Sequence, residues 1–172
     1  MGERGAARGG DSPGESLRAL VASAVDGDPS GLEERVAVAE RGDDPGPATR
    51  LSGLVAGDDS VAGVVPRIDA SVARSVADEV EGRVRLVFTG RAGDRFDGPA
   101  GAAVRSILSD RGVEAYRNEG DSPVGVLLVG DRAVVGLFDD AGLAALLWSD
   151  APPVREWAAA TCRRFLSAAE PV

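Results

Sequence analysis

Three apolar runs separated by short turns dominate the C-terminal half of this chain. They cover residues 124–129, 133–138 and 143–148, and Gly and Asp residues lie between them. Runs of about four to eight apolar residues bounded by Gly and Asp are typical of buried strands, and two-residue turns join antiparallel neighbours. The stretch from Asp121 to Trp148 therefore predicts a three-stranded antiparallel meander on which the core is built.

Strand and helix patterns alternate before the meander. Apolar runs typical of strands occupy 61–65, 83–89 and 113–117, and helical periodicity at 69–82 and 97–112 separates them. Such alternation predicts parallel βαβ units with right-handed crossovers. The predicted fold class is therefore α/β, with a mixed sheet in which βαβ units meet the C-terminal antiparallel meander.

Two helices complete this prediction. The helix over 97–112 begins at Asp97, a favourable N-cap residue, and stops at Gly112. Its apolar face, which we expect to point inward, consists of Ala103, Val104, Ile107 and Leu108. A last helix follows Asp150, ends before Pro171 and is predicted to cover the sheet. Its apolar stripe consists of Val154, Trp157, Ala158, Cys162, Phe165 and Leu166.

The N-terminal region is expected to be less regular. Residues 1–16 hold almost no large apolar side chain, so they predict a disordered tail. A short helix beginning at Ser16, a helical turn near 32–35, a strand at 36–39 and a helix over 47–56 follow. The domain prediction is one α/β domain over 17–172, in which 17–57 leads into a core at 58–172.

The charge of the chain bears on its environment and on its possible partners. The chain carries 28 acidic and 19 basic residues, and every basic residue is Arg, for a formal charge of −9. An acidic, Lys-free composition favours a protein of a high-salt cytoplasm, with a GC-rich genome as the alternative. The negative charge also disfavours DNA binding by this chain alone, because phosphate binding needs a basic face.

The absence of histidine and lysine excludes several chemistries. Without His, the Ser-His-Asp and Cys-His nucleophilic sites and most zinc sites cannot form. Without Lys, Schiff-base chemistry and a P-loop lysine are also excluded. The single cysteine, Cys162, cannot form an internal disulfide, which fits a reducing cytoplasm. No segment predicts a signal peptide or a membrane span, and no cofactor is expected.

Candidate ligand contacts lie where predicted parallel strands end. Thr89 and Arg91 follow the strand at 83–89, and Arg67 follows the strand at 61–65. Open α/β sheets bind ligands at this edge, and a hydroxyl with guanidinium groups suits an anion. Asp121, ahead of the meander, is expected near the same crevice. The alternative for all four residues is an ordinary turn or strand-to-helix loop.

Several segments together carry a resemblance to a known family. They are 61–68 (VAGVVPRI), 85–89 (RLVFT), 122–129 (SPVGVLLV), 136–142 (GLFDDAG), 149–158 (SDAPPVREWA) and 168–172 (AAEPV). Over about 32–172 the chain resembles the C-terminal effector half of haloarchaeal winged-helix transcriptional regulators. These are the group of the methanogenesis regulator FilR1 middle domain and the TrmB-like proteins. The closing segments are the most specific part.

The resemblance implies a regulatory role and also shows a departure. In that family a DNA-reading winged helix precedes the effector half, whereas only residues 1–31 precede it here, too few for that domain. We therefore expect a stand-alone effector-type domain, or a truncated reading frame.

The effector half also resembles a degenerate phospholipase D-like unit, whose H-x-K-x₄-D motif lies on a comparable hairpin. With the motif aspartate placed on Asp131, Val124 and Val126 occupy the His and Lys positions. The resemblance thus implies a scaffold that lacks the nucleophile and the phosphate-binding cation.

The leading hypothesis is a non-catalytic sensor or interaction domain related to archaeal transcriptional regulators. Its expected partners are a small-molecule effector and a second copy or a full-length regulator, with no direct nucleic-acid binding and no membrane. The first alternative is an enzyme acting on a phosphate ester with Asp and Arg side chains around 89–94. The second alternative is a remnant of a truncated regulator.

Overall fold

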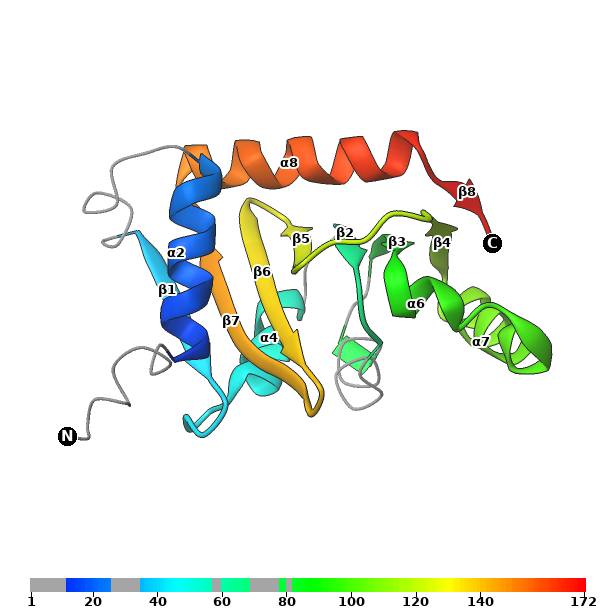
Figure 1. The fold of residues 1–172 in the computed structure, drawn as a ribbon, viewed down its shortest axis with the longest axis horizontal. Helices are drawn as coiled ribbons and strands as arrows, with labels where there is room; N and C mark the ends of the chain where they lie inside the picture. The colour runs from blue at the N-terminus through cyan, green and yellow to red at the C-terminus, as the bar shows by residue number, and fades with distance from the viewer. Residues whose placement is uncertain (1–11, 26–34, 57–59, 69–77, 80–81) are drawn as a thin grey trace.

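One mixed sheet organises the computed structural model, which describes residues 12–25, 35–56, 60–68, 78–79 and 82–172 (Figure 1). The strands are β1 (Val36–Glu40), β2 (Ser60–Val65), β3 (Arg83–Phe88), β4 (Val113–Arg117), β5 (Gly125–Val129), β6 (Arg132–Asp139), β7 (Gly142–Ser149) and β8 (Glu170–Pro171). The helices are α2 (Pro13–Val25), α4 (Pro47–Val55), α6 (Gly90–Asp94), α7 (Gly98–Asp110) and α8 (Pro152–Ser167).

The order of the strands is β1-β7-β6-β5-β2-β3-β4-β8. β2, β3 and β4 are parallel neighbours, whereas the pairs of β5, β6, β7, β1 and β8 are antiparallel. The predicted fold class is therefore confirmed: an α/β fold with a mixed sheet, an antiparallel meander of β5 to β7 and a C-terminal helix.

Glycines make the turns of the meander. Gly130 (φ 57°) lies in the two-residue turn between β5 and β6, and Gly142 (φ 117°) begins β7. These left-handed dihedrals are easy for glycine and costly for other residues. The β6–β7 pairing shifts by one residue between Leu137 and Phe138. The turns that the sequence marked with Gly and Asp are thus the turns of the hairpins.

Both outer strands of the sheet were placed by the tertiary structure. β1 pairs antiparallel with β7 along its whole length, from Val36 opposite Ser149 to Glu40 opposite Ala145. At the other edge, β8 returns after α8 and pairs with β4, with Tyr116 opposite Pro171. The sequence predicted only that the last helix ends before Pro171, and a two-residue strand is too short to leave a periodic signal.

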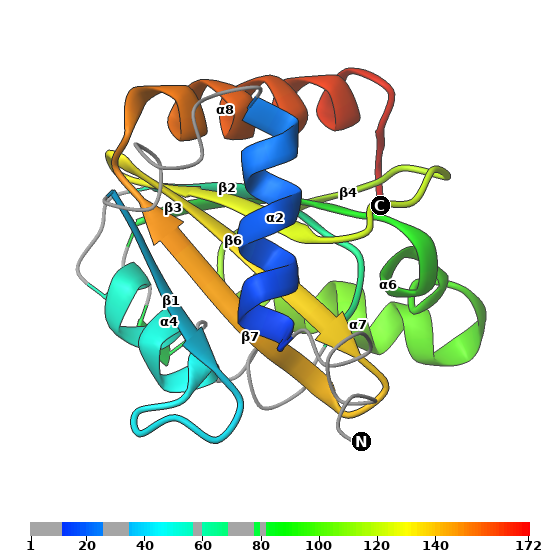
Figure 2. The same cartoon turned by 60° about the vertical axis from the view of Figure 1, so that its left-hand side comes forward.

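Helices cover both faces of the sheet. α2 and α8 lie on one face, with α8 along one end and α2 across β7, as Figures 1 and 2 show. α4 packs on the opposite face against β7, and α7 packs on that side against β4. The sheet is therefore the middle layer of three.

Three apolar clusters fill the spaces between these layers: one under α2 and α8, one under α4, and a small one of Phe88, Ala92 and Phe96 beside α6 and α7. The fully buried members under α2 and α8 are Leu17, Val21, Val124, Val126, Ala133, Val135, Ala145, Leu147, Ala151, Val154 and Ala158. Those under α4 are Leu51, Val55, Val61, Val84, Val129, Val134, Leu143 and Leu146. Successive residues of one strand alternate between the clusters, as the pleat of a strand requires.

Helix α2 begins earlier than the sequence predicted. The Ser12 hydroxyl accepts a hydrogen bond from the Glu15 backbone N–H (3.1 Å), and the Glu15 carboxylate accepts one from the Ser12 backbone N–H (3.2 Å). This reciprocal capping box starts the helix at Pro13 rather than at Ser16. The prediction of a tail to residue 16 is therefore wrong for 13–16, and 1–11 lie outside the described residues.

The predicted inner face of α7 is half wrong. Val104 and Leu108 pack against the cluster of Phe88, Ala92 and Phe96, as expected. Ala103 is exposed, and Ile107 is 60% exposed. α7 packs against β4, beyond which the sheet has only the two-residue strand β8, so the sheet beneath it is too narrow to cover its whole apolar face.

Two predictions near the parallel strands cannot be compared with the structure in full. The predicted helix over 69–82 lies largely outside the described residues, as does most of the turn at 32–35. The segment after β3, predicted as a loop, instead forms the short helix α6 over Gly90–Asp94.

A bidentate ion pair ties β1 to the β6–β7 hairpin. The Arg41 guanidinium donates to both carboxylate oxygens of Asp139, each at 2.9 Å. The Asp139 carboxylate also accepts the Ala141 backbone N–H (2.8 Å). The hydrogen bond from Arg41, followed by that from Ala141, lowers the pKa of Asp139 to about 2. The turn between β6 and β7 is therefore held by one ionised carboxylate.

We expect Asp139→Asn to lower stability at neutral pH and to lose this effect in acid. The folded pKa is below the unfolded value of about 3.9, so the carboxylate stabilises the fold above that value and loses its contribution as pH falls toward about 2. Urea unfolding of the wild type and of Asp139→Asn at several pH values in this range measures the difference between their free energies of unfolding. Asp131→Asn, in the β5–β6 turn, is the control. A difference in free energy of unfolding that does not shrink in acid would contradict the stabilising role of the ionised Asp139 carboxylate.

Close packing of two central strands makes Gly63 sensitive to substitution. A Cβ there would contact the Leu127 side chain and lie 2.5 Å from the Val126 carbonyl oxygen. We expect Gly63→Ala to reduce the free energy of unfolding by about 1–3 kcal/mol, because backbone cannot move aside cheaply. Gly53→Ala, in open space on α4, should instead raise it by up to about 1 kcal/mol. Equal effects in chemical denaturation would contradict this packing.

Candidate functional site

The strand ends that the sequence singled out do meet at one edge of the sheet. β2, β3 and β4 run parallel, so their carboxyl ends lie together, and the segment leading into β5 lies beside them. The Ala92 N–H donates to the Pro66 carbonyl (3.2 Å), and the Gly90 N–H donates to the Gly120 carbonyl (3.1 Å). These bonds join the ends of β2 and β3 to the β4–β5 segment.

Arg67 binds the β6–β7 hairpin of the chain itself. Its guanidinium donates to the Asp139 carbonyl oxygen (2.8 Å) and lies 3.7 Å from the Asp140 carboxylate. Arg67 therefore holds the hairpin against the end of β2. These contacts favour a positioning role over ligand contact for this one candidate.

Thr89 and Asp121 are brought together around Gly90. Thr89 is fully buried, and its hydroxyl has no hydrogen-bond partner among the described residues. Gly90 adopts φ +50°, and a Cβ there would collide with the Asp121 carboxylate. One oxygen of that carboxylate accepts the Ser122 backbone N–H at 2.9 Å. A buried hydroxyl without a partner is uncommon, so Thr89 stands out at this edge.

The arginine that neutralises acidic groups near α6 is Arg117 rather than Arg91. Arg117 donates to both Asp97 carboxylate oxygens (2.7 and 3.1 Å) and lies 3.5 Å from Asp94. Its hydrogen bond lowers the pKa of Asp97, and because that carboxylate is occupied, Asp97 makes no side-chain cap on α7. Arg91 is exposed and pairs with no other described residue.

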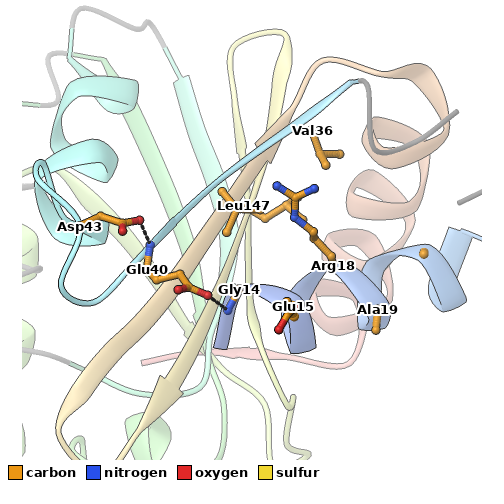
Figure 3. Close-up of a pocket in the computed structure, with 10 residues that line it drawn as sticks. Gly14, Glu15, Arg18, Ala19, Val36, Glu40, Asp43 and Leu147 are labelled. Carbon is orange, nitrogen blue, oxygen red and sulfur yellow. Dashed lines mark hydrogen bonds between the residues drawn. The ribbon is translucent and has the colours of Figure 1, made fainter. Parts of the chain in front are cut away.

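A groove of about 590 Å³ lies between α2 and β1 (Figure 3). Its floor includes Val36 and Leu147, and Arg18 extends over it from α2. The Glu40 carboxylate accepts the Gly14 backbone N–H (2.8 Å), while the Asp43 carboxylate accepts the Glu40 backbone N–H (2.7 Å). The Glu40 carboxylate therefore fastens the start of α2 to β1, and the Asp43 carboxylate holds the turn that follows β1.

A second cavity, of about 310 Å³, lies between α2, α8 and the segment that leads into β5. Its described lining consists of Leu20, Ser23, Ala24, Ser122, Pro123, Val124, Val126, Trp157, Thr161 and Arg164. None of the four candidates Arg67, Thr89, Arg91 and Asp121 belongs to the described lining of either cavity. Sequence reasoning missed Thr161, although a hydroxyl within the apolar stripe of the last helix was a usable signal.

The valines at the phospholipase D-like motif positions are core residues. Val124 is 2% exposed and Val126 is not exposed, and both belong to the cluster under α2 and α8. Asp131, at the motif aspartate position, lies exposed in the β5–β6 turn. These positions thus hold apolar packing where that motif has a nucleophile and a cation.

Cys162 on α8 is a packing residue. Its thiol lies 3.9 Å from the Val126 carbonyl oxygen, and burial raises its pKa to about 11. A thiol held protonated in this way is a poor nucleophile.

Metal and membrane features are absent from the described part of the chain. No group of three or more Cys, Asp or Glu side chains there is arranged to hold a metal ion. None of its helices combines the length and apolar character that a bilayer crossing requires.

Solved structures of similar fold include a phospholipase D family member, NucT and an archaeal chromatin protein. Nuc from Salmonella typhimurium, a phospholipase D family member, is 12% identical over 80% of this chain and 97% of its own, with a TM-score of 0.61. NucT from Helicobacter pylori is 9% identical over 80% and 99%, with a TM-score of 0.62. TrmBL2, an archaeal chromatin protein with a novel mode of DNA binding, is 13% identical over 92% and 61%, with a TM-score of 0.56.

At these identities the structural neighbours establish the fold alone. No curated protein sequence matches the chain. A family model does match: that of the methanogenesis regulatory protein FilR1, middle domain, over residues 46–168. The match covers β2 to β7, α8 and the strand-end edge, and the chain therefore belongs to the FilR1 middle-domain family of regulatory proteins.

Proposed function

We propose that this chain is a non-catalytic effector-binding domain that works in a transcription regulator. The observation that carries the proposal is the burial of Val124 and Val126 at the motif positions of a phospholipase D-like scaffold. Membership of a regulatory family supports the same conclusion. In this proposal, binding has replaced turnover on the scaffold.

The absence of His and Lys strengthens the argument against phosphodiesterase chemistry. A covalent phosphodiesterase intermediate needs a nucleophile and a cation close to the phosphate. The chain contains neither His nor Lys, and the remaining thiol, Cys162, is held protonated by burial. Two arginines at the strand ends, Arg67 and Arg117, each form an ion pair with a carboxylate of the chain itself.

The strand-end edge supplies a candidate contact surface for the effector. Thr89 offers a buried hydroxyl without a partner, and Asp121 lies beside the same Gly90. Arg91 adds an exposed guanidinium that forms no ion pair with another described residue. Arg67 holds the β6–β7 hairpin next to this surface.

We further propose that DNA contact, where the regulator makes it, belongs to a full-length regulator as partner, which carries its own DNA-binding domain. The formal charge of −9 opposes approach to a phosphate backbone. Arg41, Arg67, Arg85, Arg111 and Arg117 each pair with a carboxylate, so these guanidinium groups are already neutralised within the chain.

A hydrolysis assay separates this proposal from the enzyme alternative. With bis(p-nitrophenyl) phosphate we expect no release of p-nitrophenolate above the buffer rate, from the wild type or from an Arg67→Ala/Arg91→Ala double variant. Turnover by the wild type that the double variant abolishes would establish the phosphate-ester enzyme and overturn the non-catalytic function. Specific gel-shift of DNA by this chain alone would overturn the assignment of DNA contact to a partner.

The unpartnered Thr89 hydroxyl predicts an unusual stability effect. Thr89→Val keeps the shape and removes a buried polar group that has no partner, so we expect the free energy of unfolding to rise by about 1 kcal/mol. Ser149→Ala is the contrast, because the Ser149 hydroxyl donates to the Arg35 carbonyl (2.7 Å) and accepts the Ala151 N–H (3.0 Å). We expect the free energy of unfolding of Ser149→Ala to fall by about 1–2 kcal/mol. Destabilisation by Thr89→Val in urea titrations would show that the hydroxyl is satisfied in the free protein.

A further inference from the structure

We propose that the cavity between α2, α8 and residues 122–126 binds a small amphiphilic carboxylate. The apolar body lies against Val124 and Val126, and the carboxylate accepts hydrogen bonds from Arg164 and Thr161. The inference rests on the proposed effector-binding function and assigns to it a chemical class of effector and a second place in the fold.

The size and lining of the cavity suit a small apolar body. Its volume of about 310 Å³ is near the lower end of the range of about 300–1,000 Å³ for small-molecule sites. Apolar side chains make up more than half of its described lining: Leu20, Ala24, Pro123, Val124, Val126 and Trp157. Displacing water from such walls favours an aliphatic or aromatic group.

The charge of the lining selects an anion. Arg164 is the one charged side chain among the described lining residues, in a chain whose formal charge is −9. Its guanidinium lies 5.2 Å from the centre of the Phe165 ring and has no carboxylate partner in the described part of the chain. The stacked guanidinium therefore keeps its donors for a ligand, and its planar fork matches a carboxylate.

Thr161 supplies the second polar contact. It is 4% exposed and lines the cavity, so its hydroxyl is available to a head group bound there. Ser122, the other buried hydroxyl of the lining, is already satisfied because it donates to the Val124 carbonyl at 2.6 Å. A carboxylate oxygen near Thr161 would give this hydroxyl a charged acceptor, which makes a stronger hydrogen bond than a neutral one.

The larger groove between α2 and β1 does not suit the same ligand. Its described lining includes three acidic side chains, Glu15, Glu40 and Asp43, against one arginine, Arg18. This balance repels a carboxylate. The two cavities flank α2, and only the one beside α8 has a positive rim.

Occupancy of the smaller cavity would bear on the position of α2. Leu20, Ser23 and Ala24 of α2 form one wall, and Trp157 and Thr161 of α8 form another. α2 lies ahead of residues 46–168, to which the family model matches, and packs on α8 and β7. A ligand that contacts both helices stabilises the docked state of α2 by its differential affinity for that state. We therefore expect the position of α2 to depend on whether a ligand fills the cavity.

Three six-carbon probes test the chemical class on the whole chain. Hexanoate, hexanol and hexylamine share one apolar body and differ in the head group. In calorimetric titration we expect hexanoate to bind most tightly, hexanol weakly and hexylamine not at all. Equal affinities for the three, or tightest binding of hexylamine, would overturn the anion assignment.

Substitutions in α8 locate the head group. We expect Arg164→Gln to weaken hexanoate binding about three- to fivefold, because an exposed charge pair is worth up to about that much. Thr161→Val should weaken it about fivefold through loss of one hydrogen bond. Arg163→Gln, which changes the neighbouring exposed guanidinium outside the cavity, should leave the affinity unchanged. An effect of Arg163→Gln equal to that of Arg164→Gln would overturn the site.

A filled cavity separates failure of this inference from failure of the proposed function. Ala24→Trp places a ring in the cavity mouth, so hexanoate binding should disappear while far-UV circular dichroism stays that of the wild type. Unchanged hexanoate binding by this variant overturns the inference. If hexanoate fails to bind the wild type but another metabolite raises Tm in a Thr89-dependent way, the inference fails and the effector-binding function stands.

Discussion

Apolar side chains on both faces of the meander are the constraint on which the rest of this structure depends. Val126, Val135 and Leu147 point to one face, and Val129, Val134 and Leu146 to the other. Each such side chain contributes about 1.5–3 kcal/mol when it is removed from water. Neither face of β5 to β7 can stay open to solvent, so α2 and α8 must cover one and α4 the other.

Arginine carries all the cationic chemistry of this chain, and three of the described arginines hold loops in place. Arg41 fastens the β6–β7 turn, Arg67 fastens the same turn to β2, and Arg117 occupies Asp94 and Asp97. Pairs as exposed as these contribute little energy individually, and their value lies in fixing geometry. The strand-end edge is thus largely occupied by its own ion pairs, which leaves Thr89 as its most unusual group.

The position of the motif valines links the fold to the proposed function. In a phospholipase D-like scaffold those positions belong to the reacting groups, whereas here they form core and part of a cavity wall. The cavity beside these valines is bounded by helices on two sides, α2 and α8. In the proposed function, this shape serves recognition, and the regulatory family of the chain agrees with that use.

The sequence by itself determined the fold class, the meander and most element boundaries, because strand alternation, helical periodicity and glycine turns are local properties of the chain. Tertiary structure decided the outer strands β1 and β8, the exposure of Ile107 and the partners of Arg67 and Arg117. It also formed the cavity, where Leu20, Val124 and Thr161 converge from distant parts of the sequence. No local pattern encodes such meetings, because they depend on which faces of separate elements pack together.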